Sequence, residues 1–184
     1  MTGPTMTGPT MATGPAQLAD PSNRFHTMVT TVENKPGVLA RVAGLFARRG
    51  FNIESLAVAP TADERFSRIT FTVDVASSSL EQVVKQLDKL INVVEISELS
   101  PAESVERELM LVTVAVDAAG GRRHELLELI DDFRAYVLDE NQSQMMLSLA
   151  ARPGRLDEFE ERLRPFGIVQ LQRTGRVALA SLGA

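Results

Sequence analysis

The same order of secondary structure is predicted twice along this chain of 184 residues. Residues 25–99 and residues 107–179 each contain a strand, a helix, two strands, a second helix and a last strand. Helices are indicated by apolar residues spaced three or four positions apart, and strands by β-branched and aromatic runs that end at turn residues. Two copies of one six-element unit, joined by a linker at 100–106, therefore account for most of the chain.

The first unit begins with the strand-like stretch FHTMVTTV. The helix predicted for residues 36–49 has apolar side chains that share one face, and Gly50 stands where a glycine commonly ends a helix. These side chains are Val38, Val42, Leu45 and Phe46. FNIESLAVAP and FSRITFTVDV flank the polar TADER, which predicts an antiparallel hairpin. A second helix, SSLEQVVKQLDKLI, precedes the strand NVVEISEL, and its apolar residues are Leu80, Val83, Val84, Leu87 and Ile91.

In the second unit, ELMLVTVAV predicts a strand and RRHELLELIDDF predicts a helix. AYVLD and SQMMLSLAA predict a hairpin around ENQS, and GRLDEFEERLRPF predicts another helix. GIVQLQRTG is predicted to be the last strand. The apolar face of the first helix is predicted to hold Leu126, Leu127 and Ile130, and that of the second Leu156, Phe159 and Leu163.

The order βαββαβ folds as a ferredoxin-like unit, an antiparallel sheet with both helices on one face. The predicted fold class is therefore α+β, with two such units in tandem. The other face of the sheet has no cover from within the unit. With strand residues such as Ile69, Phe71 and Val73 offering apolar groups, that open face would be costly in water. We therefore expect a second copy of the chain to cover it in a two-fold dimer.

The composition excludes several classes of protein. The net charge of −5 argues against nucleic-acid binding, which calls for a surplus of Lys and Arg. The absence of cysteine excludes disulfides and thiolate chemistry. No apolar stretch approaches the ~20 residues of a membrane span. Residues 1–23 repeat MTGPT, lack the features of a secretory signal and are predicted to be a disordered tail. We expect a cytoplasmic protein.

Residues for catalysis or metal binding are hard to find in this sequence. The two histidines, His26 and His124, have no neighbours at the spacing of a metal site or a catalytic triad. Acidic stretches such as DEFEER alternate with apolar residues and read as solvated helix faces. No dinucleotide, P-loop or nucleophile-elbow motif occurs. We therefore predict no catalytic site and no metal site, and a protein that binds and regulates.

The loop VENKPG, before the first helix, has two interpretations. Asn34 can cap the helix and Pro36 suits its first turn, which is a purely structural explanation. Gly37 is not explained in this way, because glycine in a first turn costs stability relative to alanine. The alternative is a ligand carboxylate that approaches the backbone N–H groups at the helix start.

The segments VENKPGVLARVAGLFARRGFNIESLAVAPT, KQLDKLINVVEISEL, VERELMLVTV and GIVQLQRTGRVALA resemble the small, regulatory subunits of acetolactate synthase, also called acetohydroxyacid synthase. The pattern N-x-x-G-x-L alone indicates only an ACT domain, whereas together with RRGFNIESLAVAPT and EREL it is specific. The resemblance implies an ACT domain at residues 25–99, for effector binding and dimerisation. It also implies an ACT-like, ferredoxin-like domain at residues 107–179, followed by a short tail at 180–184.

Small subunits of this family have no activity of their own. The resemblance implies a partner, the catalytic large subunit, which joins pyruvate to a second 2-keto acid in branched-chain amino-acid synthesis. It implies that this chain activates that transferase and confers feedback inhibition by valine, with leucine or isoleucine possible. No cofactor is expected in this chain. Thiamine diphosphate, Mg and FAD are expected in the large subunit.

The family's effector site lies between the ACT domains of two chains. Its positions in this sequence are Asn34, Gly37, Val38, Leu39, Asn52 and Ile53. By resemblance, the first four form the loop and helix start of one chain, and Asn52 and Ile53 belong to the facing strand of the partner. The backbone around Gly37 would take the effector carboxylate, both Asn side chains would bond its polar groups, and Ile53 would bury its apolar part.

Two other functions stay open. The chain could be a free-standing amino-acid sensor that acts on another partner, such as a transcription or transport protein. No helix-turn-helix segment is predicted, which counts against direct control of DNA. An enzyme in its own right would need catalytic residues that the sequence does not show.

Overall fold

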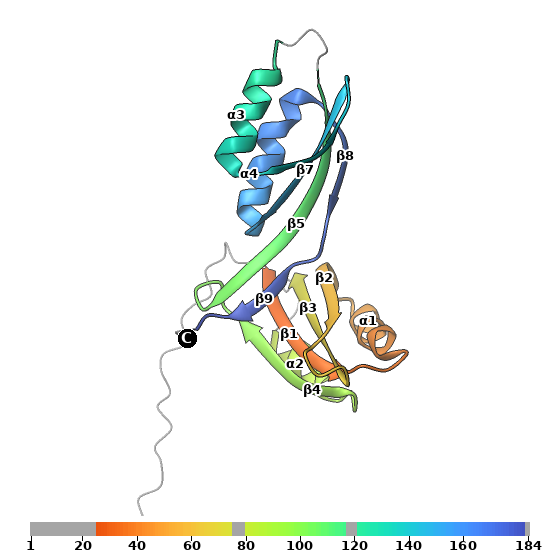
Figure 1. The fold of residues 1–184 in the computed structure, drawn as a ribbon. Coiled ribbons are helices and arrows are strands. Elements are labelled where there is room, and N and C mark those ends of the chain that lie inside the picture. The colour runs from red at the N-terminus through yellow and green to blue at the C-terminus, as the bar shows by residue number, and fades with distance from the viewer. Residues whose placement is uncertain (1–24, 75–79, 117–120, 183–184) are drawn as a thin grey trace, which may run out of the picture.

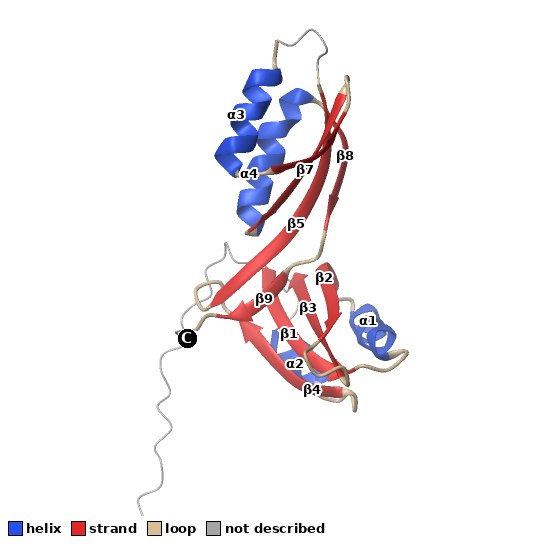
Figure 2. Ribbon diagram, viewed as in Figure 1, coloured by secondary structure: helices blue, strands red, loops and turns tan. Residues whose placement is uncertain are grey.

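The computed structural model describes residues 25–74, 80–116 and 121–182; the predicted tail at 1–23 lies outside them. Two antiparallel sheets, each with two helices, follow one another along the chain, as Figures 1 and 2 show. In chain order, the elements are β1 (Phe25–Glu33), α1 (Val38–Arg49), β2 (Asn52–Pro60), β3 (Phe66–Asp74), α2 (Leu80–Leu87), β4 (Val93–Leu99), β5 (Ser104–Ala115), α3 (Arg123–Phe133), β6 (Tyr136–Glu140), β7 (Gln144–Ala151), α4 (Pro153–Leu163), η1 (Arg164–Phe166), β8 (Ile168–Arg173) and β9 (Val177–Ala180).

The first sheet has the strand order β2-β3-β1-β4, and α1 and α2 pack on one of its faces. The interior is formed mainly by aromatic and β-branched side chains. The Phe46 ring, on α1, meets the Phe71 ring, on β3, edge to face with centroids 4.9 Å apart. The fully buried members of this core include Met28, Phe46, Ile69, Phe71, Val73, Val83 and Leu87. The predicted βαββαβ order is confirmed for this unit.

Both helices of the first unit are shorter than predicted. Helix α1 begins at Val38 rather than at residue 36. Gly50 follows its last residue, Arg49, and has a φ of +70°, the left-handed conformation expected of a helix-ending glycine. Helix α2 ends at Leu87. Ile91 lies beyond it and is 90% exposed, so its predicted place on the buried helix face is wrong.

The open face of the first sheet differs from the prediction. Residues paired across antiparallel strands share a face, and Leu56 pairs with Phe71 while Ala57 pairs with Thr70. The apolar residues of β3 therefore point toward the helices. The face away from the helices carries mostly small and hydroxyl-bearing side chains: Thr27, Val29, Thr31, Ser55, Ala57, Ala59, Thr70 and Thr72. An apolar face that needs a second copy to cover it was therefore the wrong expectation.

The second sheet has the order β6-β7-β5-β8, with α3 and α4 on one face. Leu126, on α3, is buried as predicted, whereas Leu127 is exposed and Leu129 takes its place. The predicted interior residues of α4 are all buried: Leu156, Phe159 and Leu163. The second unit thus repeats the βαββαβ order, which confirms two tandem ferredoxin-like units.

Strand β5 connects the two sheets. It begins at Ser104, inside the stretch 100–106 that the sequence assigns to a linker. Its residues 104–107 pair with a strand that the sequence did not predict, β9. Register places Ser104 opposite Ala180 and Arg107 opposite Val177. The two-stranded ribbon made by β9 and residues 104–107 of β5 lies over the open face of the first sheet (Figure 1). The chain itself therefore covers part of that face.

Candidate functional site

The loop between β1 and α1 positions the first group of predicted site residues. Gly37 is the residue just before α1 and has a φ of +83°, the left-handed conformation that residues with a Cβ seldom adopt. A Cβ built there would meet no atom within 4 Å. Backbone conformation therefore explains Gly37, and the space beside it is open to a ligand.

Asn34 does not cap the helix, contrary to the structural interpretation of its role. Its backbone N–H donates to the carbonyl of Arg65 at 2.7 Å, and its side-chain Nδ2 donates to the carbonyl of Glu64 at 2.9 Å. Both acceptors belong to the turn between β2 and β3. Asn34 therefore ties the loop at the start of α1 to that turn, and no side chain caps α1.

The turn that receives Asn34 is itself held by an ion pair. The Arg65 guanidinium bonds both carboxylate oxygens of Asp63, at 2.6 Å for the shortest contact. These hydrogen bonds lower the pKa of Asp63 to about 2. At neutral pH the carboxylate of Asp63 is thus ionised and fully engaged within the turn.

The N-terminal end of α1 offers free donors. The first helical hydrogen bond joins the N–H of Arg41 to the carbonyl of Gly37 at 3.0 Å, and the N–H of Val38 reaches Lys35 at 3.3 Å. Among the described residues, the N–H groups of Leu39 and Ala40 donate to no acceptor. These two donors point along the positive end of the helix dipole, which favours an anion.

The predicted site residues do not all expose their side chains. Val38 is buried in the first core, so it can offer a ligand only its backbone, whereas Leu39 is exposed. Ile53 is half-buried and packs against the same core. The Asn52 side chain is exposed at the start of β2.

Asn52 and Ile53 lie far from the loop within one chain. They follow the C-terminal end of α1, whereas Gly37 precedes its N-terminal end, and twelve residues of helix separate the two ends by about 18 Å. One small ligand cannot touch both groups in a single chain. Asn52 and Ile53 lie on β2, which is an edge strand and, among the described strands, pairs only with β3.

A polar joint between the two units was not predicted from the sequence. The backbone N–H of Arg176 donates to Ser55 Oγ at 2.7 Å, and the Arg176 guanidinium donates to Thr27 Oγ1 at 3.2 Å. Thr27 in turn donates to the Glu106 carboxylate at 2.8 Å, which lies 3.3 Å from the guanidinium. Ser55 and Thr27 belong to the first sheet. The joint therefore fastens the ribbon of β5 and β9 to the open face.

A buried carboxylate continues this joint into the second unit. Glu108, on β5, is 7% exposed and accepts from Arg173 at 2.6 Å and from Arg176 at 3.4 Å. Burial alone would lower the pKa of the Arg173 guanidinium, but hydrogen bonds with Asp157 and Glu108 outweigh it and raise that pKa above its ordinary value. The sequence signal was present in VEREL and QRTGR, yet the pairing needs the fold.

Gly175 allows the chain to pass close to the first sheet. A Cβ added at this position would lie 2.0 Å from the carbonyl oxygen of Leu56 and 2.9 Å from the N of Ala57. Real Cβ atoms do not come so close to backbone atoms, so only glycine permits this approach. The joint thus depends on backbone contact as well as on charge.

The described residues hold no group of three or more His, Asp or Glu side chains arranged for a metal ion. Across the same residues, no helix has the length and apolar character needed to span a membrane. The chemistry that the site residues do offer is recognition: free N–H donors, two side-chain amides and apolar side chains.

Two family models match the chain: "AHAS small subunit-like ACT domain" over residues 28–95, and "Small subunit of acetolactate synthase" over residues 107–182. The acetolactate synthase small subunit of Mycobacterium bovis is 45% identical over 159 residues, which cover 86% of this chain and 94% of that protein. The corresponding protein of Mycolicibacterium smegmatis is 44% identical over 155 residues, covering 84% and 90%.

A solved structure is also similar over both units. The crystal structure of the acetolactate synthase small subunit from Thermotoga maritima superposes with a TM-score of 0.80 at 32% sequence identity. The match covers 88% of this chain and 99% of that chain. Sequence and structure therefore point to the same family over nearly the whole described chain.

Proposed function

This chain belongs to the family of acetolactate synthase small subunits, and on that premise we propose that it binds and activates a catalytic large subunit and makes it sensitive to branched-chain amino acids, valine foremost. The regulatory role follows from the family. The activation and the identity of the effector are the proposal. By family resemblance, thiamine diphosphate, Mg and FAD are proposed to bind to the large subunit.

One observation supports the effector site above all: the two halves of the predicted site lie at opposite ends of α1, and each adjoins one end of β2, since Asn52 begins that strand and Asn34 is bonded to the turn that follows it. If two copies pair through β2 across a two-fold axis, the strands run antiparallel. The first residue of one β2, Asn52, then lies beside the last residue of the other, Pro60. The turn after Pro60 is the one to which Asn34 is bonded. Such pairing brings Asn52 of one chain to the loop of its neighbour.

The proposed site matches the chemistry of a branched amino acid. The carboxylate is bound by the free N–H groups of Leu39 and Ala40 at the positive end of α1. The side-chain amides of Asn34 and Asn52 complete the polar contacts, since an amide both donates and accepts. Ile53 of the neighbouring chain and the exposed Leu39 shield the branched side chain of the ligand.

A site shared by two chains also supplies a mechanism for regulation. A ligand that touches both chains stabilises the relative orientation in which both sets of contacts form. Only such a difference in affinity between orientations can change the activity of the large subunit. Coupling energies of this kind are typically about 1–3 kcal/mol, or about 5- to 150-fold in affinity.

The proposed function is tested with the two purified subunits. We expect this chain alone to form no acetolactate from pyruvate, and to raise the acetolactate output of its cognate large subunit when added at increasing ratios. Valine should then lower the output of the mixture but not that of the large subunit alone. Equal output with and without this chain would contradict the proposal. Co-purification with an unrelated protein instead would favour a free-standing sensor.

The shared site predicts a specific complementation result. Gly37→Asp damages the loop half of the site and Asn52→Ala the strand half, so each homodimer should bind valine at least about 10-fold more weakly than the wild type. A heterodimer of the two variants contains one site with both changes and one with neither. We therefore expect one valine per heterodimer at nearly wild-type affinity, measured by calorimetry on heterodimers purified through two different affinity tags.

The control is a wild-type dimer that carries the same two tags, which should bind two valines. If the heterodimer of variants binds no better than either parent, the loop and the strand of each site belong to one chain, and the shared site is wrong.

A further inference from the structure

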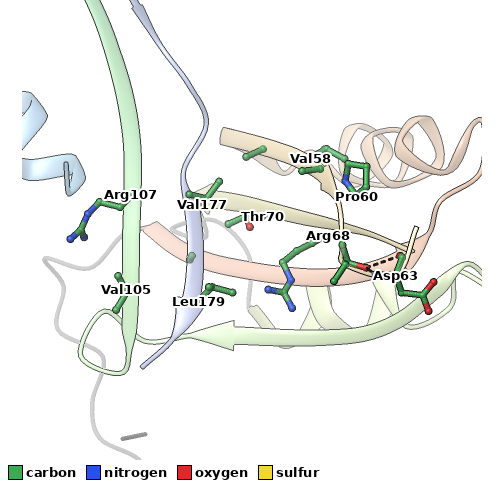
Figure 3. Close-up of a pocket in the computed structure, with 14 residues that line it drawn as sticks. Val58, Pro60, Asp63, Arg68, Thr70, Val105, Arg107, Val177 and Leu179 are labelled. Atoms are coloured by element: carbon green, nitrogen blue, oxygen red, sulfur yellow. Dashed lines mark hydrogen bonds between the residues drawn. The ribbon is translucent and has the colours of Figure 1, made fainter. Parts of the chain in front are cut away.

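A groove of about 670 Å³ lies between the open face of the first sheet and the ribbon of β5 and β9. One wall is formed by β2, the turn that follows it, and β3; the other is formed by β5 and β9 (Figure 3). The groove lies on the face of the sheet opposite α1 and α2. None of the proposed effector-site residues lines it.

Large apolar side chains are exposed on the wall of this groove that β5 and β9 form. Val105, Val177 and Leu179 are 47%, 53% and 58% exposed there. Single exposed apolar residues are normal on protein surfaces, but several that converge on one hollow indicate a binding surface. An apolar partner would remove these three side chains from water.

A cation without a partner lies among these apolar side chains. Arg68, on β3, extends across the groove toward β9, as Figure 3 shows. Its Nε is buried, and its guanidinium forms no hydrogen bond or ion pair with any described residue. Leaving a buried donor unsatisfied is costly, and an ionised partner would relieve the cost with a bidentate contact.

The acidic residues close to Arg68 do not supply that partner. Asp63 lines the groove but is paired with Arg65. Glu95 lies in the same row of the sheet, two strands away across Thr31, and forms no ion pair with Arg68. The positive charge in the groove is thus without a partner among the described residues.

We propose that this groove is the docking site for a segment of the catalytic large subunit that carries apolar side chains and a carboxylate for Arg68. The proposal rests on the proposed function, because it takes the large subunit to be the partner. An exposed apolar wall beside an unpaired cation matches the apolar core and charged anchor of protein interfaces. A second copy placed groove to groove would instead bring two unpaired guanidinium groups together.

The same groove is connected to the effector loop. Residues 61–63 of the turn line the groove, and residues 64 and 65 of that turn accept the hydrogen bonds of Asn34. A ligand that orders the loop around Gly37 therefore acts on a segment that the docked partner touches. The two hydrogen bonds of Asn34 and the turn between β2 and β3 would thus link effector binding to the contact with the large subunit.

The test compares charge changes inside and outside the groove, in the full chain with its cognate large subunit. Arg68→Glu should weaken binding of the large subunit at least about 30-fold, since it removes one partner of a buried charge pair and repels the carboxylate. Arg68→Met keeps the apolar length of the side chain and should weaken binding about 10-fold. Arg162→Glu, an identical charge change on the exposed face of α4, should leave it unchanged. Binding is measured by interferometry with immobilised large subunit.

Valine binding to the isolated variants, by calorimetry, shows that they are folded, because the groove and the effector site lie on different faces. Large-subunit binding within about 2-fold of the wild type in both Arg68 variants would overturn the docking proposal while leaving the proposed function intact. A shift of Arg68→Glu from dimer to monomer in gel filtration would overturn it as well, because the groove would then hold a second copy. Failure of the wild type itself to bind or activate the large subunit would be the failure of the proposed function.

Discussion

Gly37→Asp is expected to raise the valine concentration that inhibits the two-subunit enzyme by at least about 100-fold, while activation of the large subunit by this chain persists. Gly37 has a φ of +83° and open space around it, and Asp is among the residues that tolerate this conformation best. The main effect is therefore electrostatic: a fixed carboxylate lies where the carboxylate of the effector must bind. Acetolactate output in a valine titration measures it.

Gly37→Asn is the matched control, because it has nearly the same shape and the same backbone tolerance but no charge. We expect Asn to raise the inhibitory concentration by no more than about 10-fold. If both variants lost inhibition equally, backbone conformation and not charge would explain the loss. If Gly37→Asp bound valine as tightly as the wild type, the site would not be at this loop.

Gly175→Val is expected to lower the free energy of unfolding by about 2–3 kcal/mol, as overpacking of a tight contact does. Its Cβ would lie 2.0 Å from the carbonyl oxygen of Leu56, and rigid backbone cannot give way as a flexible side chain can. The ribbon of β5 and β9 should therefore lift from the first sheet. The amide of Arg176, which donates to Ser55, should lose its protection from hydrogen exchange. Urea unfolding and hydrogen-exchange mass spectrometry measure the two effects.

Gly154→Ala, at the first turn of α4, is the control: it measures how replacing a glycine changes the free energy of unfolding where there is no close contact. No atom lies within 4 Å of a Cβ added there, so the change should be neutral or slightly stabilising because alanine favours helices. An unfolding curve for Gly175→Val that coincides with the wild type, together with normal protection of Arg176, would show that the close approach at Gly175 does not hold the two units together.

Local patterns were sufficient to predict the helices and strands of the two βαββαβ units and their order, but not β9. Periodic apolar residues identified α1 and α4, and the turn residues of TADER and ENQS identified both hairpins, because these signals depend on neighbours in the sequence. The ends of the helices were predicted less accurately. The buried face of α2 ends at Leu87, and Ile91, although correctly spaced, lies beyond the last helical turn.

Contacts between distant segments could not be predicted in the same way. Asn34 is a residue type that commonly caps helices, yet the carbonyl groups to which it donates are 30 and 31 residues away in the sequence. Strand β9 is short, and the residues of β5 with which it pairs lie 70 to 76 positions earlier in the sequence. The choice of effector-site residues rests on resemblance and stays a prediction. Their grouping at the two ends of α1, and the groove with Arg68, required the fold.

The long strand β5 has a mechanical consequence. Its twelve residues span about 40 Å at the usual rise per residue; its first part is fastened to the first unit, and the rest supports α3 and α4. A tilt of about 5° where the ribbon rests on the first sheet would displace the far end of such a strand by about 3–4 Å. A small rearrangement around a bound amino acid could in this way become a displacement as large as an atom at the opposite end of the molecule, without any hinge in between.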